Sequence, residues 1–581
     1  MIAMQALDAF DGLLDNIAGL AESDSLNADP QPYDETTEED FPYLTKDAIP
    51  DDPSKAAIIG IIDDALPFAH EQFRVGKATS RIASVWFQDA FWDPTNPVGQ
   101  DLPFGKELRG GQITQLLKEL QNGTLKSEGD LYRKAGVLDL NRPVPPRLAL
   151  TGGHGASVGG LAAGVSPKDP DLGQALPIIA TCLPPAVIRD TLGFAAPFYI
   201  ILGTLQIIFR ARRLCRWIER VKGLPANSVR LPVLINLSFG LTAGPKDGSS
   251  LMDQLFDAIA DVQSPDLGPV RFLIAMGNHR LSRVRARVPA NAAEPLDWSV
   301  KPDDRTASFV EIWGAPGGTR PPSQPMQIEV TPPGQSTAIT TTFASHGTYQ
   351  NFFLNGREIA RAYLQFKLFE GRGREVITLV VPPTVPEKIG EDYGVPGRWQ
   401  LRVIAPAGAF FDCYIQRDDT VPGFGVRRGR QSRFQDPDDP IYAPDGRPIL
   451  FDPPGKMTGG LRMGTINAFA CGRNQIRVGG LYEESCETVP YSALGFEQPQ
   501  TAAEGDVRAS SAVSTVLRSL PVMGMQSGGR WEMAGTSMAT PIVTRALAQA
   551  FIDGAVTDDS HTGLVKLLRS RVPCNGPPLT S

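Results

Sequence analysis

Three short, continuous apolar runs form the first pattern along the chain, and each stops at a glycine or polar residue. The runs are 57–62 before Asp63, 231–235 before Asn236, and 272–276 before Gly277 and Asn278. Runs of this length are typical of strands buried on both faces of a parallel sheet. Ligands of open α/β sheets bind beyond the carboxyl ends of the strands. The pattern therefore predicts an α/β fold with Asp63 and Asn278 on one edge of the sheet.

A second pattern occupies the middle of the chain. Four segments there are rich in β-branched or aromatic residues, several alternate in polarity, and Pro- and Gly-rich turns separate them. They are 308–313, 326–330, 376–381 and 399–404. We expect an antiparallel β-sandwich over 300–420, inserted into the α/β domain. Residues 421–458, rich in Asp, Arg, Pro and Gly, predict a connecting loop, and a strand near 474–480 indicates that the α/β domain resumes over 459–581.

Two stretches have the composition of buried helices. Small residues dominate 154–164, and glycine costs about 1 kcal/mol relative to alanine in an exposed helix. This set therefore suits a helix pressed between other elements, with His154 at its N-terminal end. The apolar run 195–209 imitates a membrane span but is too short for a bilayer, so we predict a buried helix that continues to about Val221. Residues 106–134 carry the helical pattern of an added surface segment.

Size and charge narrow the classes of protein. At 581 residues with 42% hydrophobic residues, the chain exceeds a single core, and two or more domains are expected. The net charge of −8 argues against a nucleic-acid surface, and no segment predicts a membrane partner. Six cysteines without a CxxC pair indicate neither a disulfide framework nor a zinc site. With an N-terminus that lacks a secretory signal, they predict a cytoplasmic protein.

Residues 1–50 form an acidic extension that contains Glu38-Glu39-Asp40 and many small polar residues. We interpret it either as a flexible tail or as a regulatory segment that occludes the cleft. Residues 51–299 then form the first part of the α/β domain, before the insertion.

Three residues have the chemistry of nucleophilic catalysis. Ser537 lies between a glycine turn and a predicted helix start in the segment 535–541, Gly-Thr-Ser-Met-Ala-Thr-Pro. A serine hydroxyl is a poor nucleophile, so a base must take its proton, and the imidazole of His154 suits that role. A carboxylate on the far ring nitrogen fixes the tautomer, and Asp63 suits this position.

The same chemistry needs donors for the oxyanion that forms when an amide is attacked. The side-chain N–H of Asn278 and the backbone N–H of Ser537 are the candidates. A helix that begins near Ser537 would add a favourable dipole. Pro541 is compatible with the first turn of that helix, where its missing N–H matters little.

These segments resemble those of the subtilisin-like serine proteases, the subtilases. Residues 61–66, Ile-Ile-Asp-Asp-Ala-Leu, resemble the aspartate motif of that family. Residues 154–158, His-Gly-Ala-Ser-Val, resemble its histidine motif, with Ser157 in place of a second histidine. Residues 535–541 depart least from its serine motif. The order Asp, His, Ser is also that of subtilisin.

The resemblance covers roughly residues 51–300 and 455–581, in pieces, and implies a serine endopeptidase that works through an acyl-enzyme. Residues 236–240 resemble the family's substrate-binding strand, and Met276 stands where it would narrow the pocket for the side chain before the cleaved bond. The β-sandwich resembles the jelly-roll domain inserted in some bacterial subtilases. The expected site residues are Asp63, His154 and Ser537 for catalysis, Asn278 for the oxyanion, and Ser238, Phe239, Gly240, Met276 and Gly277 for substrate binding.

Several alternatives stay open. The chain is a protease acting on protein or peptide, an esterase or transpeptidase of the same chemistry, or a catalytically silent member that binds a protein partner through the β-sandwich. Catalysis requires no cofactor, whereas acidic clusters such as Asp51-Asp52 either ligate structural calcium, as in many subtilases, or are solvated loops. The resemblance puts the catalytic carboxylate at Asp63 rather than Asp64. His279 either lines the cleft or lies on the surface.

Overall fold

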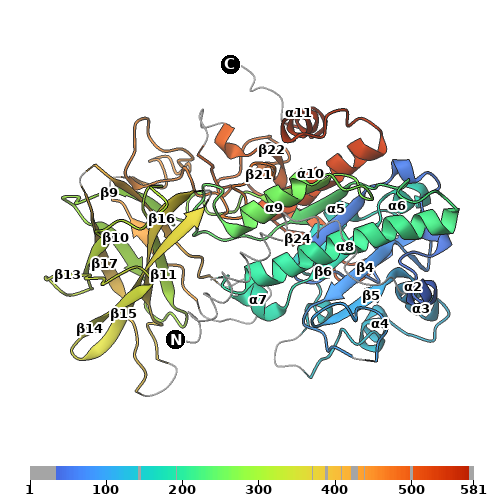
Figure 1. Ribbon diagram of the computed structural model, residues 1–581, viewed down its shortest axis with the longest axis horizontal. Coiled ribbons are helices and arrows are strands. Elements are labelled where there is room, and N and C mark those ends of the chain that lie inside the picture. Colours follow the sequence, from blue (N-terminus) through green and yellow to red (C-terminus); the bar gives the residue numbers. More distant parts are fainter. Residues whose placement is uncertain are drawn as a thin grey trace.

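The chain folds into an α/β part and an antiparallel β part, which lie side by side at the right and left of Figure 1. The computed structural model describes residues 35–93, 95–141, 146–190, 193–369, 371–386, 390–406, 408–419, 429–437, 439–496 and 502–574. Residues 1–34, which make up most of the predicted acidic extension, lie outside the described residues.

The α/β part is built on an eight-stranded sheet with the order β22-β21-β8-β7-β1-β6-β4-β5. The strands pair in parallel, except that β5 is antiparallel to β4. Their bounds are β1 (Ile58–Asp63), β4 (Ile82–Phe87), β5 (Lys106–Arg109), β6 (Ile178–Cys182), β7 (Val233–Leu237), β8 (Val270–Ala275), β21 (Ile476–Tyr482) and β22 (Val507–Ala512). The three predicted apolar runs are therefore neighbours, as β1, β7 and β8.

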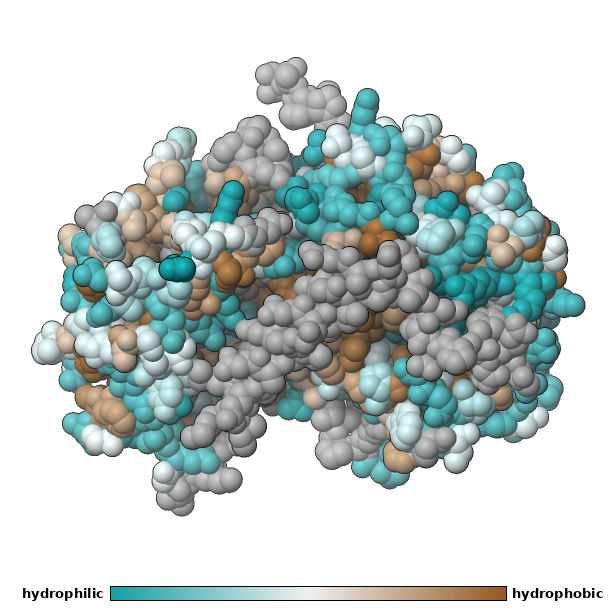
Figure 2. All heavy atoms as spheres, viewed as in Figure 1, coloured by the Kyte–Doolittle hydropathy of each residue, from teal (hydrophilic) through white to brown (hydrophobic). Residues whose placement is uncertain are grey.

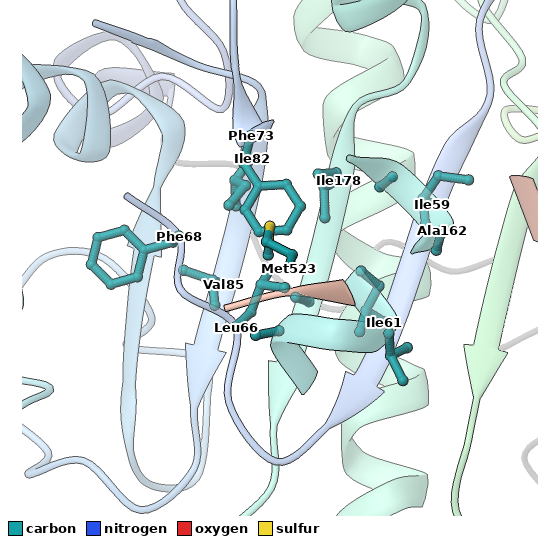
Figure 3. Close-up of a cluster of buried hydrophobic side chains, with 14 of the residues drawn as sticks. Ile59, Ile61, Leu66, Phe68, Phe73, Ile82, Val85, Ala162, Ile178 and Met523 are labelled. Atoms are coloured by element: carbon teal, nitrogen blue, oxygen red, sulfur yellow. The ribbon is translucent and has the colours of Figure 1, made fainter. Parts of the chain in front are cut away.

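Alternate residues of β1 enter two different apolar clusters, one on each face of the sheet. Ile59 and Ile61 belong to the cluster under α5 (His154–Ala163) and α10 (Thr536–Ile552), part of which is shown in Figure 3. Ile58 and Ile62 belong to the cluster under α8 (Ala196–Lys222) and α9 (Leu251–Asp261). This burial on both faces explains the continuous apolar run.

The remaining helices surround these layers. They are α2 (Glu35–Asp40), α3 (Gly110–Gln121), α4 (Glu128–Lys134), α6 (Pro170–Ala175), α7 (Pro185–Arg189) and α11 (His561–Arg571). The predicted helical segment 106–134 is thus β5, α3 and α4. The chain already belongs to the packed core at Tyr43 and Leu44, which are fully buried beneath α8.

The predicted buried helices are confirmed. α5 packs between β1 and α10, where its small residues allow close approach. α8 begins one residue before Pro197 and ends at Lys222, and it lies across the sheet in Figure 1. Among the described residues, no helix is both long and apolar enough to cross a bilayer.

The β part consists of a five-stranded and a seven-stranded antiparallel sheet, with the orders β13-β12-β17-β10-β19 and β14-β15-β16-β11-β18-β9-β20. The first contains β10 (Leu296–Val300), β12 (Gln327–Thr331), β13 (Ile339–Thr340), β17 (Gly397–Ile404) and β19 (Arg433–Gln435). The second contains β9 (Arg285–Pro289), β11 (Ser308–Trp313), β14 (Thr348–Leu354), β15 (Arg357–Phe369), β16 (Arg372–Val381), β18 (Phe410–Ile415) and β20 (Gly459–Gly460).

Side chains from both sheets fill one apolar cluster, which includes Trp298 and Trp399 from one sheet and Ile312 and Ile377 from the other. The predicted α/β fold with an inserted antiparallel β-sandwich is therefore confirmed. The strands extend from Arg285 to Gly460, a wider interval than 300–420, because the insertion begins and ends with strands of the larger sheet. On the face in Figure 2, hydrophilic residues cover most of the described surface of both parts.

One disulfide was not predicted from the sequence. Cys486, beyond β21, is joined by a disulfide to Cys574, beyond α11. The two are 88 residues apart in sequence, and the fold brings together the segments that follow β21 and α11. Such a pair has no local spacing signal. The other described cysteines, Cys182, Cys215, Cys413 and Cys471, are free.

The core under α5 gives a stability prediction. Ile59 is fully buried, so Ile59→Ala should lower the free energy of unfolding by about 2–5 kcal/mol through lost burial and a residual cavity. Leu140 is 59% exposed, and Leu140→Ala should change it by less than about 0.5 kcal/mol. Urea denaturation followed by tryptophan fluorescence measures both. Equal destabilisation by the two variants would contradict the packing described.

Candidate active site

The carboxyl ends of β1, β7 and β8 meet at one edge of the sheet. Ile62 is in register with Leu237, and Leu237 with Ile274, so the residues that follow these positions are neighbours. A cavity of about 640 Å³ opens at this edge. The cavity is lined by most of the predicted site residues, namely Asp63, His154, Ser238, Phe239, Gly240, Gly277, Asn278 and Ser537.

Asp63 and His154 form a hydrogen-bonded pair in the cavity wall. Nδ1 of His154 lies 2.7 Å from Oδ1 of Asp63. The same carboxylate oxygen accepts the backbone N–H of Asp64 at 2.8 Å, which fixes the carboxylate. Because an ionised carboxylate can only accept, the proton of neutral His154 is on Nδ1, and Nε2 keeps its lone pair.

Asp64 has a different task. Its Oδ2 accepts Nε of Arg147 at 3.0 Å in a buried ion pair. Its Oδ1 accepts the backbone N–H groups of Ala65 and Gly155, each at 2.6 Å. Since Gly155 is the second residue of α5, Asp64 fixes the helix start that carries His154. The geometry thus pairs the imidazole with Asp63 and the helix terminus with Asp64.

The carboxylates control the protonation of His154. Burial alone would lower the pKa of the imidazole, but the charge and hydrogen bond of Asp63, with a smaller contribution from Asp64, outweigh it. The pKa of His154 is therefore raised above its ordinary value. By contrast, burial lowers the pKa of His70 to about 4, and its Nδ1 accepts the backbone N–H of Gln72. His70 is thus a buried structural residue.

Ser537 is the second residue of α10, and a strained turn precedes it. Gly535 has φ +134°, a conformation that residues with a Cβ rarely adopt, which explains the glycine. The first backbone N–H groups of a helix lack intrahelical acceptors, so that of Ser537 is suited to bind an anion. The hydroxyl of Ser537 donates to the carbonyl oxygen of Ser238 at 3.2 Å and not to His154.

Pro541 corrects one expectation, because it lies inside α10 rather than in its first turn. Without an N–H, Pro541 cannot donate to the carbonyl of Ser537 four residues earlier. That carbonyl instead accepts a hydrogen bond from Oγ of Ser238 at 3.1 Å, and Ser238 Oγ in turn accepts one from Nδ2 of Asn236 at 3.0 Å. Oδ1 of Asn236 accepts the hydroxyl of Thr544 at 3.1 Å. The proline thus frees a carbonyl that ties α10 to the end of β7.

Asn278 is held by the residue that precedes Ser537. Its Oδ1 accepts the backbone N–H and the hydroxyl of Thr536, at 2.9 and 3.0 Å. The Thr536 hydroxyl oxygen also accepts the backbone N–H of Gly277 at 3.1 Å. With Oδ1 engaged, the amide presents Nδ2 as its donor end, which suits an oxyanion bound beside the N-terminus of α10.

Of the two other residues considered from the sequence, His279 lines the cavity and Met276 does not. Met276 is buried in the apolar cluster under α8 and α9, and the cavity is lined there by Ala275 and Gly277. His279 does line the cavity, and its Nδ1 lies 3.3 Å from the hydroxyl of Ser282.

Sequence reasoning missed other residues of the cavity. Arg417 and Asp419, which follow β18 of the inserted β domain, reach the cavity and form an ion pair of 2.6 Å. Trp531, which is 41% exposed, lies in β24 (Arg530–Met533). It packs so close to Gly152 that a Cβ there would meet the indole ring. Asn467 lines the cavity from the segment that returns to the α/β part. These positions carry no local motif.

The described residues contain no group of three or more His, Cys, Asp or Glu side chains placed to hold a metal ion. The Asp51-Asp52 cluster offers no further ligand: Asp52 caps a short 3₁₀ turn by accepting the backbone N–H of Ser54 at 3.0 Å.

Comparison with known proteins supports the fold. No protein-family model matches the chain, and no match is found among curated proteins. Among solved structures, the chain is similar to the CspB protease of Clostridium perfringens, with a TM-score of 0.56 and 16% sequence identity. The match covers 92% of this chain and 87% of that one. The fold is therefore subtilisin-like, with a parallel sheet flanked by helices and an inserted β domain.

The Asp63–His154 pair gives a pH prediction. Because the Asp63 charge raises the pKa of His154, Asp63→Asn should lower that pKa below the ordinary value of about 6.5, as burial then dominates. NMR titration of histidine-labelled protein measures the change. The low pKa of His70 should stay near 4 and serves as the control. An unchanged His154 titration in the variant would contradict the pairing.

Proposed function

We propose that the chain is a serine endopeptidase that cleaves peptide bonds through an acyl-enzyme intermediate. The observation that supports this most is the convergence of four groups on one cavity: Ser537 at a helix N-terminus, His154 with a free Nε2, Asp63 on its Nδ1, and Asn278. The likeness to a protease structure is in keeping with this proposal.

In the proposed reaction, Ser537 Oγ leaves the Ser238 carbonyl and turns to Nε2 of His154. His154 takes the hydroxyl proton as Oγ bonds to the substrate carbonyl carbon. The carbonyl oxygen becomes an oxyanion beside Nδ2 of Asn278 and the backbone N–H of Ser537. His154 then returns the proton to the leaving amine as the C–N bond breaks. Water then attacks the ester carbon of the acyl-enzyme and gives its proton to His154. His154 passes the proton to Ser537 Oγ as the ester bond breaks, and the carboxylic acid product is released.

The chain itself supplies a nucleophile, a base and hydrogen-bond donors to the oxyanion, so the proposed reaction needs no cofactor. We expect the extended backbone of a protein or peptide substrate to pair with residues 238–240, as in β-strand addition. The inserted β domain contributes Arg417 and Asp419 to the cavity, and we propose it as the surface through which a protein partner would act on the site.

One observation favours a second candidate, a catalytically silent protein that binds peptides in the same cavity. The hydroxyl of Ser537 is hydrogen-bonded to a backbone carbonyl and not to the imidazole. A serine that keeps this bond is not activated, because a carbonyl oxygen cannot take its proton at neutral pH.

A fluorophosphonate probe separates the two functions. We expect it to label Ser537, identified by peptide mass spectrometry, because phosphonylation needs an activated serine. Ser537→Ala should abolish labelling, while Ser570→Ala, on the exposed side of α11, should retain it. Wild-type protein that is folded but unlabelled would favour the silent candidate.

Asn278 should contribute mainly to turnover. Asn278→Ala removes a donor to the oxyanion, so kcat on a peptide substrate should fall by about 10²–10³. KM should change little, because the interaction forms in the transition state. Asn122→Ala, an exposed asparagine beyond α3, is the matched control. A fall in kcat of less than threefold, on the order of 0.6 kcal/mol, would argue against the oxyanion role.

A further inference from the structure

The two walls of the cavity come from different strands. One wall is the segment that follows β7, with Phe239, Gly240 and Leu241. The other is the end of β8 and the residues that lead to Asn278. The chemistry requires a fixed separation between them, because substrate backbone pairs with the first and the oxyanion donor stands on the second.

A single buried side chain connects these walls. Nδ2 of Asn467 donates to the carbonyl oxygens of Phe239 at 3.1 Å and Ala275 at 3.0 Å, one on each wall. Its Oδ1 accepts the backbone N–H groups of Leu241 at 3.1 Å and Phe469 at 3.0 Å. Both donors of the amide are therefore used, and Asn467 is 4% exposed.

The backbone of Asn467 strengthens the same connection. Its N–H donates to the carbonyl oxygen of Met276 at 2.8 Å. The next residue, Ala468, donates to the carbonyl oxygen of Leu241 at 3.0 Å. The peptide before Gly277 and the peptide after Leu241 are thus both held by this one turn of chain.

Asn467 also fills the space between the walls. A Cβ on Gly240 would lie 2.0 Å from Oδ1 of Asn467, so the close approach requires glycine at that position. Asn467 lines the cavity at this point. In the proposed reaction the attacked carbonyl lies beside Asn278, and we expect the side chain before the cleaved bond to enter between Gly240 and Gly277. Asn467 then forms the floor beneath it.

We propose that Asn467 is a positioning residue of the site, which fixes the distance between the two walls and limits how deep a substrate side chain can enter. The proposal rests on the proposed endopeptidase function for its kinetic effect, but the floor and the connection apply equally to a protein that only binds peptides.

The first experiment measures kinetics per active site, counted with the fluorophosphonate probe. Asn467→Ala should lower kcat by about 10²-fold, as expected for misplaced reacting groups. We compare two peptides that differ only in the residue before the cleaved bond, Leu or Ala. Because Asn467→Ala deepens the space for that side chain, the kcat/KM of the Leu peptide divided by that of the Ala peptide should rise. Asn467→Asp keeps the acceptor and the shape but removes both donors, so it should lose kcat to a similar extent.

The control is a buried amide of the same return segment. Gln475 is fully buried, and its side chain bonds to Gly472 and Asp253 away from the cavity. Gln475→Ala should lower the melting temperature to a comparable extent, yet leave kcat per site and the Leu/Ala ratio unchanged. If Asn467→Ala and Gln475→Ala have the same kcat and the same ratio, Asn467 is merely structural and the proposal is overturned.

A binding experiment decides the proposal without chemistry. In the Ser537→Ala background, Asn467→Ala should weaken binding of the Ala peptide by up to about 10-fold, since ordered walls are lost, and weaken the Leu peptide less. Gln475→Ala should change neither affinity. An unlabelled, inactive wild type would reject the endopeptidase function, whereas equal peptide affinities with and without Asn467 would reject the role of this residue.

Discussion

The register of β1, β7 and β8 is the constraint on which the rest of the site depends. Because the strands run in parallel, their carboxyl ends share one edge, and residues far apart in sequence meet there. A slip of one residue would turn Asp63 to the other face of the sheet. The alternation of Ile58 to Ile62 between two apolar clusters opposes such a slip, since it would move the core residues as well.

Electrostatics at this edge depend on the separate tasks of two adjacent carboxylates. Asp63 is buried beside the imidazole and holds it in one tautomer. Asp64 is neutralised by Arg147 and holds the start of α5. Burial raises the pKa of Asp63, and the charge of Asp64 adds to this rise. The charge and hydrogen bond of His154 oppose it, so the imidazole is the partner that favours the ionised form of Asp63.

Much of the fold and of the candidate site could be predicted from the sequence, because the signals are local. The strands β1, β7 and β8 are continuous apolar runs, and the segments of Asp63, His154 and Ser537 have the residue types that the proposed chemistry requires. Other features depend on tertiary contacts. Asn467 and Arg417 lie in segments without periodicity, and their contacts exist because the inserted β domain returns the chain beside the cavity. Met276 was expected in the pocket, but its side chain enters the apolar cluster under α8 and α9, and Ala275 and Gly277 line the cavity instead.

The attachment of the inserted β domain has a mechanical consequence. The chain leaves the α/β part just after Asn278, enters β9 at Arg285, leaves β20 at Gly460 and passes Asn467 on its return. Both tethers of the β domain therefore end on groups that shape the cavity. A displacement of that domain relative to the α/β part would therefore reach the cavity first, at the two connections beside Asn278 and Asn467.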